Sequence, residues 1–186
     1  MVLNNGAWTQ DTADAAHQSS PKLAAWISAF LSTDRPVIDL GCGIGYYVNY
    51  LREHGFEAFG IEGYKLNNFV TEYVFVRDLT KPLLFKGEPH VITLEVGEHI
   101  PKEHEQTFLD TITNSCGDKL VMSWALPGQP GIGHINCQPR EYIIAEINRR
   151  GFRYLPEVTE EAKQHVDDNC DWFRRTLLIF ERVSKA

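Results

Sequence analysis

Short apolar runs alternate along the chain with segments whose apolar residues recur every three or four positions. The first pattern is typical of buried strands and the second of amphipathic helices. The apolar runs predict strands at 37–40, 57–61, 73–76, 90–96, 119–124, 152–157 and 176–183. The helical spacing predicts helices at 21–31, 46–54, 66–70, 101–114 and 140–150. Strands that alternate with helices in this way indicate an α/β domain.

The first predicted helix has a clear start. Ser20 is a favourable N-cap and Pro21 fits the first turn. Gly55 ends the next helix, because glycine readily takes the left-handed conformation found at helix ends. The residues before Ser20 are mostly polar. We therefore expect a polar N-terminal arm or lid at 1–19 and one folded domain at 20–186.

Length, net charge and cysteine content limit the classes of protein to which the chain can belong. The chain has 186 residues, which suits a single domain with a sizeable core. Its net charge of −7 disfavours broad electrostatic contact with nucleic acid or an anionic membrane. No apolar run approaches the roughly 18 residues that a membrane helix needs. The chain has four widely spaced cysteines and no C-x-x-C pair: Cys42, Cys116, Cys137 and Cys170. This pattern indicates free thiols, and we therefore expect a cytoplasmic protein.

The most informative segment is a glycine loop, residues 39–45, which follows the strand predicted at 37–40. Glycines let backbone N–H groups approach a ligand closely, and a helix that starts at Tyr46 directs its positive end there. In the NAD-binding pattern G-x-G-x-x-G the third glycine would fall at Tyr46, but here it is Gly45. The sequence D-x-G-x-G-x-G, beginning at Asp39, resembles the first motif of class I S-adenosylmethionine (SAM) dependent methyltransferases.

This resemblance implies a fold and a cofactor site. The fold is Rossmann-like and doubly wound, with a mostly parallel seven-stranded sheet whose last strand is antiparallel. SAM would bind at the glycine loop, and the acidic Asp39 suits its cationic sulfonium. The residues that the resemblance assigns to cofactor binding are Asp39, Gly41, Cys42, Gly43, Gly45, Glu62, Asp78, Leu79 and Glu95.

Two of these carboxylates have specific expected roles. Glu62 ends the second strand, 21 residues after Gly41, where a carboxylate can accept hydrogen bonds from both ribose hydroxyls. Asp78 follows the third strand, and in the family an acidic residue here meets the adenine amino group while the next N–H, that of Leu79, meets the ring. The alternatives are a surface carboxylate for Glu62, and an Asx turn or a pair with Arg77 for Asp78.

A second segment suggests the chemistry. Glu95-Val96-Gly97-Glu98-His99 resembles the E-V-x-E-H segment of small-RNA 2′-O-methyltransferases and ubiquinone-pathway O-methyltransferases. The strand ends at 95 and 124 would bring this segment beside the 127–139 loop, which carries His134. We expect His134, Glu95 and His99 to be catalytic. The same group with Glu98 could hold Mg²⁺ or Mn²⁺ and lower the pKa of the acceptor hydroxyl.

Simpler interpretations of this segment remain open. Glu98 could cap the helix that begins near Pro101, His99 could be packed in the core, and His134 could act alone as a general base without a metal. Trp8 is unusual in a polar arm. It is either a tail residue or part of a lid that closes over bound SAM.

These observations favour a SAM-dependent O-methyltransferase acting on a hydroxyl of a small polar or sugar-like molecule. The 127–139 loop supports a polar acceptor through its hydrogen-bonding residues Gln129, His134, Asn136 and Gln138. We expect no nucleic-acid or membrane partner, and the oligomeric state stays open. Two alternatives are an RNA ribose 2′-O-methyltransferase and a non-catalytic α/β protein that binds SAM or NAD.

Overall fold

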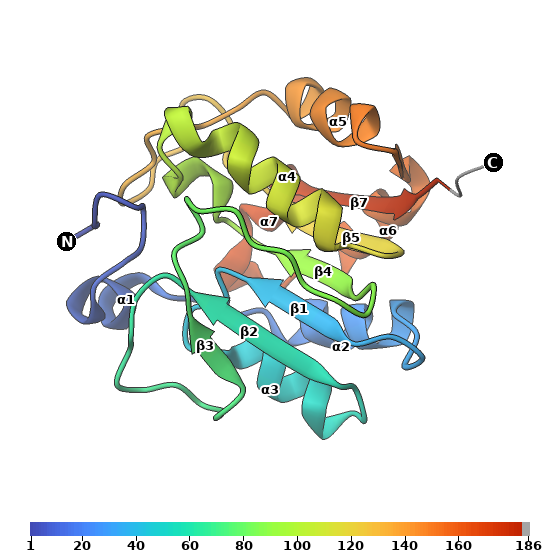
Figure 1. Cartoon of the computed structure of the whole chain (residues 1–186), viewed down its shortest axis with the longest axis horizontal. Coiled ribbons are helices and arrows are strands. Elements are labelled where there is room, and N and C mark those ends of the chain that lie inside the picture. The colour runs from blue at the N-terminus through green and yellow to red at the C-terminus, as the bar shows by residue number, and fades with distance from the viewer. Residues whose placement is uncertain (184–186) are drawn as a thin grey trace.

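The computed structural model describes residues 1–183 and contains one seven-stranded sheet in the order β3-β2-β1-β4-β5-β7-β6 (Figure 1). The last strand is antiparallel to both of its neighbours, and the other adjacent pairs are parallel. The predicted Rossmann-like sheet is therefore confirmed. The strands are β1 (Val37–Leu40), β2 (Ala58–Glu62), β3 (Val74–Val76), β4 (His90–Thr93), β5 (Lys119–Ser123), β6 (Phe152–Tyr154) and β7 (Leu177–Arg182).

Helices cover both faces of the sheet (Figure 1). The apolar side chains of α2 (Pro21–Phe30), α3 (Tyr46–Glu53) and α6 (Pro156–Gln164) share one buried cluster with one face of the strands. Those of α4 (Glu105–Ser115) and α5 (Arg140–Arg149) share a second cluster with the other face. The Ser20 hydroxyl accepts a hydrogen bond from the N–H of Leu23, which confirms the predicted N-cap.

The helix predicted at 101–114 begins at Glu105 instead, after a 3-10 helix at Lys102–His104. Three further predicted elements differ from the structure. The helix predicted at 66–70 does not form, because side chains of the N-terminal arm bond this segment instead: Gln10 accepts from the N–H of Asn67 at 2.6 Å. β4 ends at Thr93 rather than Val96, since Glu95 has a left-handed φ of 53°. β6 ends at Tyr154, and the following α6 was missed although Pro156 marks its first turn.

The N-terminal arm, residues 1–19, lies along the carboxyl ends of the central strands (Figure 1). It contains a bridge between Val2 and Trp8 and the helix α1 (Gln10–Ala16). Gly6 fits there because its φ is 85° and because any Cβ would collide with the carbonyl group of His99. Within residues 1–183, no helix is long and apolar enough to cross a membrane.

Candidate functional site

A cavity of about 420 Å³ opens at the carboxyl ends of β1, β2 and β4. Parallel sheets of this kind form their ligand sites at this edge. The glycine loop forms its floor, and the N-terminal arm and the 127–139 loop supply further walls. The short helix α7 (Phe173–Thr176), with the residue before it, completes the lining. Most of the predicted site residues therefore line one space, but Gly45, Asp78 and Glu98 are not among the lining residues.

The glycine loop depends on backbone conformations that other residues rarely adopt. Gly41, Gly43 and Gly45 have φ values of 79°, 56° and 85°. A Cβ at Gly41 would collide with the side chain of Val96, and one at Gly43 would collide with the His17 imidazole. The loop therefore presents bare backbone toward the cavity, as close contact with a ligand requires.

Two carboxylates lie side by side behind this loop. Asp39 on β1 and Glu62 at the end of β2 are 3% and 9% exposed. Glu62 accepts hydrogen bonds from the N–H groups of Gly43 at 2.8 Å and Gly63 at 2.7 Å. One oxygen of Asp39 has no hydrogen-bond partner among residues 1–183. An uncompensated acidic pair of this kind suits a ligand that brings a positive charge or hydroxyl groups.

Burial raises the pKa of both groups. The pKa of Asp39 rises to about 8, through desolvation and then through the nearby Glu62. The pKa of Glu62 rises to about 7 through desolvation, although its backbone N–H partners oppose the change. The folded protein therefore holds protons on these carboxyls at neutral pH that an unfolded chain would release.

Stability should consequently fall as the pH rises. A carboxyl whose pKa is raised by folding stabilises the protein fully below its unfolded value near 4, and this contribution is lost as the pH approaches the folded value. We expect the free energy of unfolding in urea to drop between pH 5.5 and pH 8.5 by about 1 kcal/mol or more beyond the drop in Asp39→Asn, which cannot ionise. Equal drops in the two proteins would contradict the raised pKa of Asp39.

Of the two residues expected at the adenine, only one reaches the cavity. Leu79 lines it, as does Cys42 from the glycine loop. The Asp78 carboxylate instead accepts hydrogen bonds from the N–H of Thr80 at 2.9 Å and from its hydroxyl at 2.7 Å. This is the Asx-turn arrangement, which leaves one carboxylate oxygen for another partner. The adenine role of Asp78 stays a prediction.

Glu95 connects three segments that surround the cavity, through hydrogen bonds of its backbone and its carboxylate. Its N–H donates to the Ser123 hydroxyl at 2.7 Å, which fixes the end of β4 against β5. Its carboxylate accepts hydrogen bonds from Thr176 at 2.8 Å and from the Gln129 amide at 3.0 Å. These bonds engage the two oxygens of Glu95 with α7 and the 127–139 loop. The structure therefore does not group Glu95 with the histidines, as the sequence predicted for a metal site.

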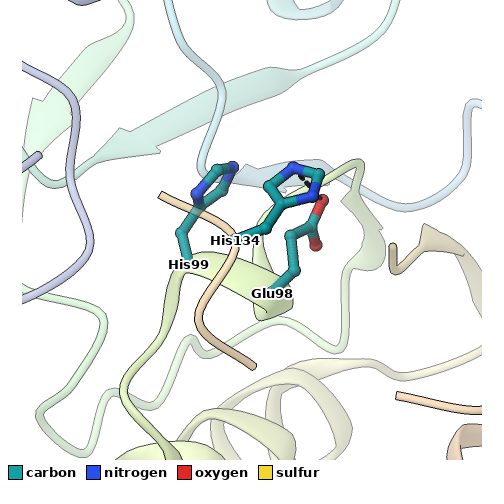
Figure 2. Close-up of side chains that lie close together, drawn as sticks. All are labelled: Glu98, His99 and His134. Atoms are coloured by element: carbon teal, nitrogen blue, oxygen red, sulfur yellow. Dashed lines mark ion pairs between the residues drawn. The ribbon is translucent and has the colours of Figure 1, made fainter. Parts of the chain in front are cut away.

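The other three residues of that prediction do converge, as Figure 2 shows for Glu98, His99 and His134. One ligand atom from each lies within 4.8 Å of the others. The ring centroids of His99 and His134 are 5.1 Å apart, and Nε2 of His134 is 3.9 Å from Oε1 of Glu98. This cluster comes from the turn after β4 and from the 127–139 loop, which are far apart in sequence.

Hydrogen bonds determine which ring nitrogens are available. Nδ1 of His99 lies 3.1 Å from the carbonyl oxygen of Gly133, and Nδ1 of His134 lies 3.2 Å from that of Gln129. A carbonyl oxygen only accepts, so each Nδ1 donates and each neutral ring keeps a lone pair on Nε2. Burial lowers the pKa of His99 to about 4, which keeps that ring neutral at pH 7.

Glu98 completes the cluster from beneath. It is fully buried, and neither carboxylate oxygen has a hydrogen-bond partner within the described chain. Burial, together with the charge of Glu95, raises the pKa of Glu98 well above its usual value. The alternative that Glu98 caps a helix is wrong, because α4 begins without a side-chain cap. Such a group needs either a proton or a cation beside it.

His17 lines the cavity but could not be found from the sequence, whereas Trp8 was noted there as a possible lid residue. The His17 imidazole packs against Gly43, and its pKa is lowered by burial. The Trp8 ring meets the His99 ring edge-on at 5.3 Å, so Trp8 covers the site in this structure. In the sequence, Trp8 stands out as an aromatic residue in a polar arm, but nothing in the sequence marks His17. That the arm opens and closes as a lid stays a prediction.

Comparison with solved structures identifies the fold. The chain is similar to a TehB-like SAM-dependent methyltransferase from Corynebacterium glutamicum, at 15% identity and a TM-score of 0.64 over 94% of this chain and 93% of that one. It is also similar to the CcbJ methyltransferase of Streptomyces caelestis, at 12% identity and a TM-score of 0.66 over 97% and 98% of the two chains.

A third similar structure contains a cofactor product. It is a magnesium protoporphyrin IX methyltransferase from Synechocystis with bound SAH, at 19% identity and a TM-score of 0.61 over 93% of this chain and 83% of that one. No protein-family model matches the chain, and no curated protein matches it. The resemblance is therefore one of fold, that of SAM-dependent methyltransferases.

Proposed function

We propose that the chain is a SAM-dependent O-methyltransferase that acts on a hydroxyl of a small polar acceptor. The observation that carries the cofactor is the buried pair of Asp39 and Glu62 behind a glycine loop whose left-handed backbone has no room for side chains. Among residues 1–183 the pair has no positive partner, which the sulfonium would supply. The similar Synechocystis enzyme, crystallised with SAH, supports this cofactor.

The chain's own residues would divide the work as follows. Gly41 and Gly43, which carry no side chain, would let the amino-acid part of SAM approach the loop closely, and the remaining lone pairs of Glu62 would accept the ribose hydroxyls. When bound, SAM supplies the methyl group. The Trp8 side chain and the 127–139 loop exclude water from the cavity where the acceptor would lie.

The three-residue cluster fits a divalent cation. Nε2 of His99, Nε2 of His134 and the Glu98 carboxylate offer two imidazoles and one oxygen donor, and Glu98 is otherwise unpartnered. Two imidazoles favour Mn²⁺ over Mg²⁺, because Mg²⁺ prefers oxygen ligands. When bound, the metal would lower the pKa of a hydroxyl. The backbone carbonyls behind both rings would orient them as ligands.

The same geometry permits a mechanism without metal. The lone pair on Nε2 of His134 would accept the hydroxyl proton, and an ionised Glu98 at 3.9 Å would stabilise the resulting imidazolium. In both versions the acceptor is a hydroxyl held beside His134. The two versions differ in whether Glu98 and His99 bind a cation or support the base.

The product tests the proposal directly. We expect the purified chain to bind SAM and not NADH, and to transfer the methyl of labelled SAM to an oxygen atom of a small molecule. Carbon and proton NMR of the isolated product locates the methyl group. A methyl on nitrogen, carbon or sulfur would contradict O-methylation, and binding of NADH in place of SAM would contradict the cofactor.

A further inference from the structure

One basic residue lines the cavity and has no partner among residues 1–183. Arg175 in α7 is the only arginine or lysine among the cavity-lining residues, and its guanidinium makes no hydrogen bond or ion pair with residues 1–183. Its neighbour Arg174 differs completely: it pairs with Asp168 at 2.8 Å and with Asp171 at 2.6 Å. In a chain of net charge −7, carboxylates to pair with are plentiful. Arg175 is an exposed residue and is thus left available to a ligand.

The fold places Arg175 away from the proposed cofactor carboxylates. β7 begins two residues later at Leu177, which lies opposite Ser123 at the end of β5. The strand order β1-β4-β5-β7 therefore separates this position from Asp39 on β1 by three strand spacings, roughly 14 Å. The 127–139 loop, with His134, follows β5 on the same side. Arg175 thus belongs to the acceptor end of the cavity.

The surroundings of Arg175 indicate how an acceptor would be oriented. Thr176, the next residue, donates to Glu95, and the Gln129 amide occupies the other oxygen of Glu95. This carboxylate is therefore already engaged and does not need Arg175. Trp172 and Ile132 line the same cavity and offer apolar contact to the body of an acceptor.

We propose that Arg175 binds a carboxylate or phosphate group of the acceptor, so that the substrates are anionic hydroxyl compounds. The planar guanidinium can give two parallel hydrogen bonds to either group. This anchor would turn the hydroxyl end of the molecule toward His134. The inference rests on the proposed methyl transfer, and it changes the expected acceptor from a neutral sugar-like molecule to an acidic one.

The test uses the whole chain with methyl-labelled SAM and a small-molecule extract of the source cells. The extract is divided by anion exchange at neutral pH, and each fraction is offered as acceptor. We expect label only in products from the retained, anionic fraction. With that fraction, Arg175→Gln should raise KM by about tenfold or more, with kcat and SAM affinity unchanged. Arg174→Gln removes the same charge one residue away and should leave KM unchanged.

Each other outcome has a defined meaning. Label in the unretained fraction alone, or a KM unchanged in Arg175→Gln, overturns the inference while methyl transfer stands. If Arg175→Gln weakens binding of SAM but not of 5′-methylthioadenosine, the anion is the cofactor's own carboxylate and the inference is also overturned. Failure to bind SAM at all would instead contradict the proposed function. SAM binding without label in any fraction would contradict a small-molecule acceptor, and this inference with it.

Discussion

Gly43→Val is expected to abolish SAM binding. The residue has a left-handed φ of 56°, which is strained for a β-branched side chain, and its position is already filled from one side by the His17 imidazole. A valine would displace the N-terminal arm or occupy the space where backbone and ligand must meet. Isothermal calorimetry with SAM measures the loss, and thermal unfolding shows whether the variant is folded.

Two further variants make this result interpretable. Gly55→Val carries the same backbone strain, since its φ is 87°, but nothing lies within 4 Å of the added Cβ. It should lose stability and keep SAM binding. Glu62→Ala removes the ribose acceptor and should weaken binding by ~1–3 kcal/mol, the range for a hydrogen bond to a charged group. Unchanged SAM affinity in both Gly43→Val and Glu62→Ala would contradict the cofactor assignment.

The fold could be predicted because its signals are local. β1 has the bounds that its apolar run predicts, and Ser20 caps α2 as expected. Errors arose where tertiary contacts decided the local structure. The chain near Asn67 looks helical in isolation, but the side chain of Gln10 binds its backbone N–H. The pattern after Thr93 looks like a continuing strand, but Glu95 turns out of it to reach Gln129 and Thr176.

The site residues also fall into those that local sequence patterns predict and those that tertiary contacts decide. Gly43 and Glu62 were predictable because the glycine loop and the following strand end have fixed sequence spacing. The hydrogen bonds of Glu95 to Gln129 and Thr176, which leave it outside the cluster of Glu98 and the histidines, were not predictable, because they depend on a backbone angle and on partners far along the chain. His17 was hidden for a related reason: it reaches the site through the packing of the arm, which leaves no periodic pattern in the sequence.

If a metal organises the cluster of Glu98, His99 and His134, its removal should stop turnover and leave SAM binding intact. Glu98, His99 and His134 are not the residues proposed to hold SAM, so a chelator should affect the chemistry without removing a cofactor contact. Mn²⁺ should restore the rate better than Mg²⁺, because two of the three ligands are imidazoles. Calorimetric titration of the chain with Mn²⁺ gives a readout that does not depend on activity, and Glu98→Gln should abolish that binding while keeping the buried volume.

Substitution of His134 then separates the two versions of the mechanism. His134→Ala should lower the rate roughly 10²-fold or more in either case, whereas His165→Ala, an exposed histidine at the end of α6, should have no effect. If His134 works as a base without metal, chelation changes nothing. Glu98→Gln then lowers the rate only modestly, because the substitution removes a charge that stabilises the imidazolium but removes no metal ligand.

Full activity in both His134→Ala and the Glu95/Glu98 double alanine variant would contradict both versions. The acceptor hydroxyl would then have to be activated elsewhere in the cavity, and His17, which packs against the glycine loop, would be the next side chain to replace.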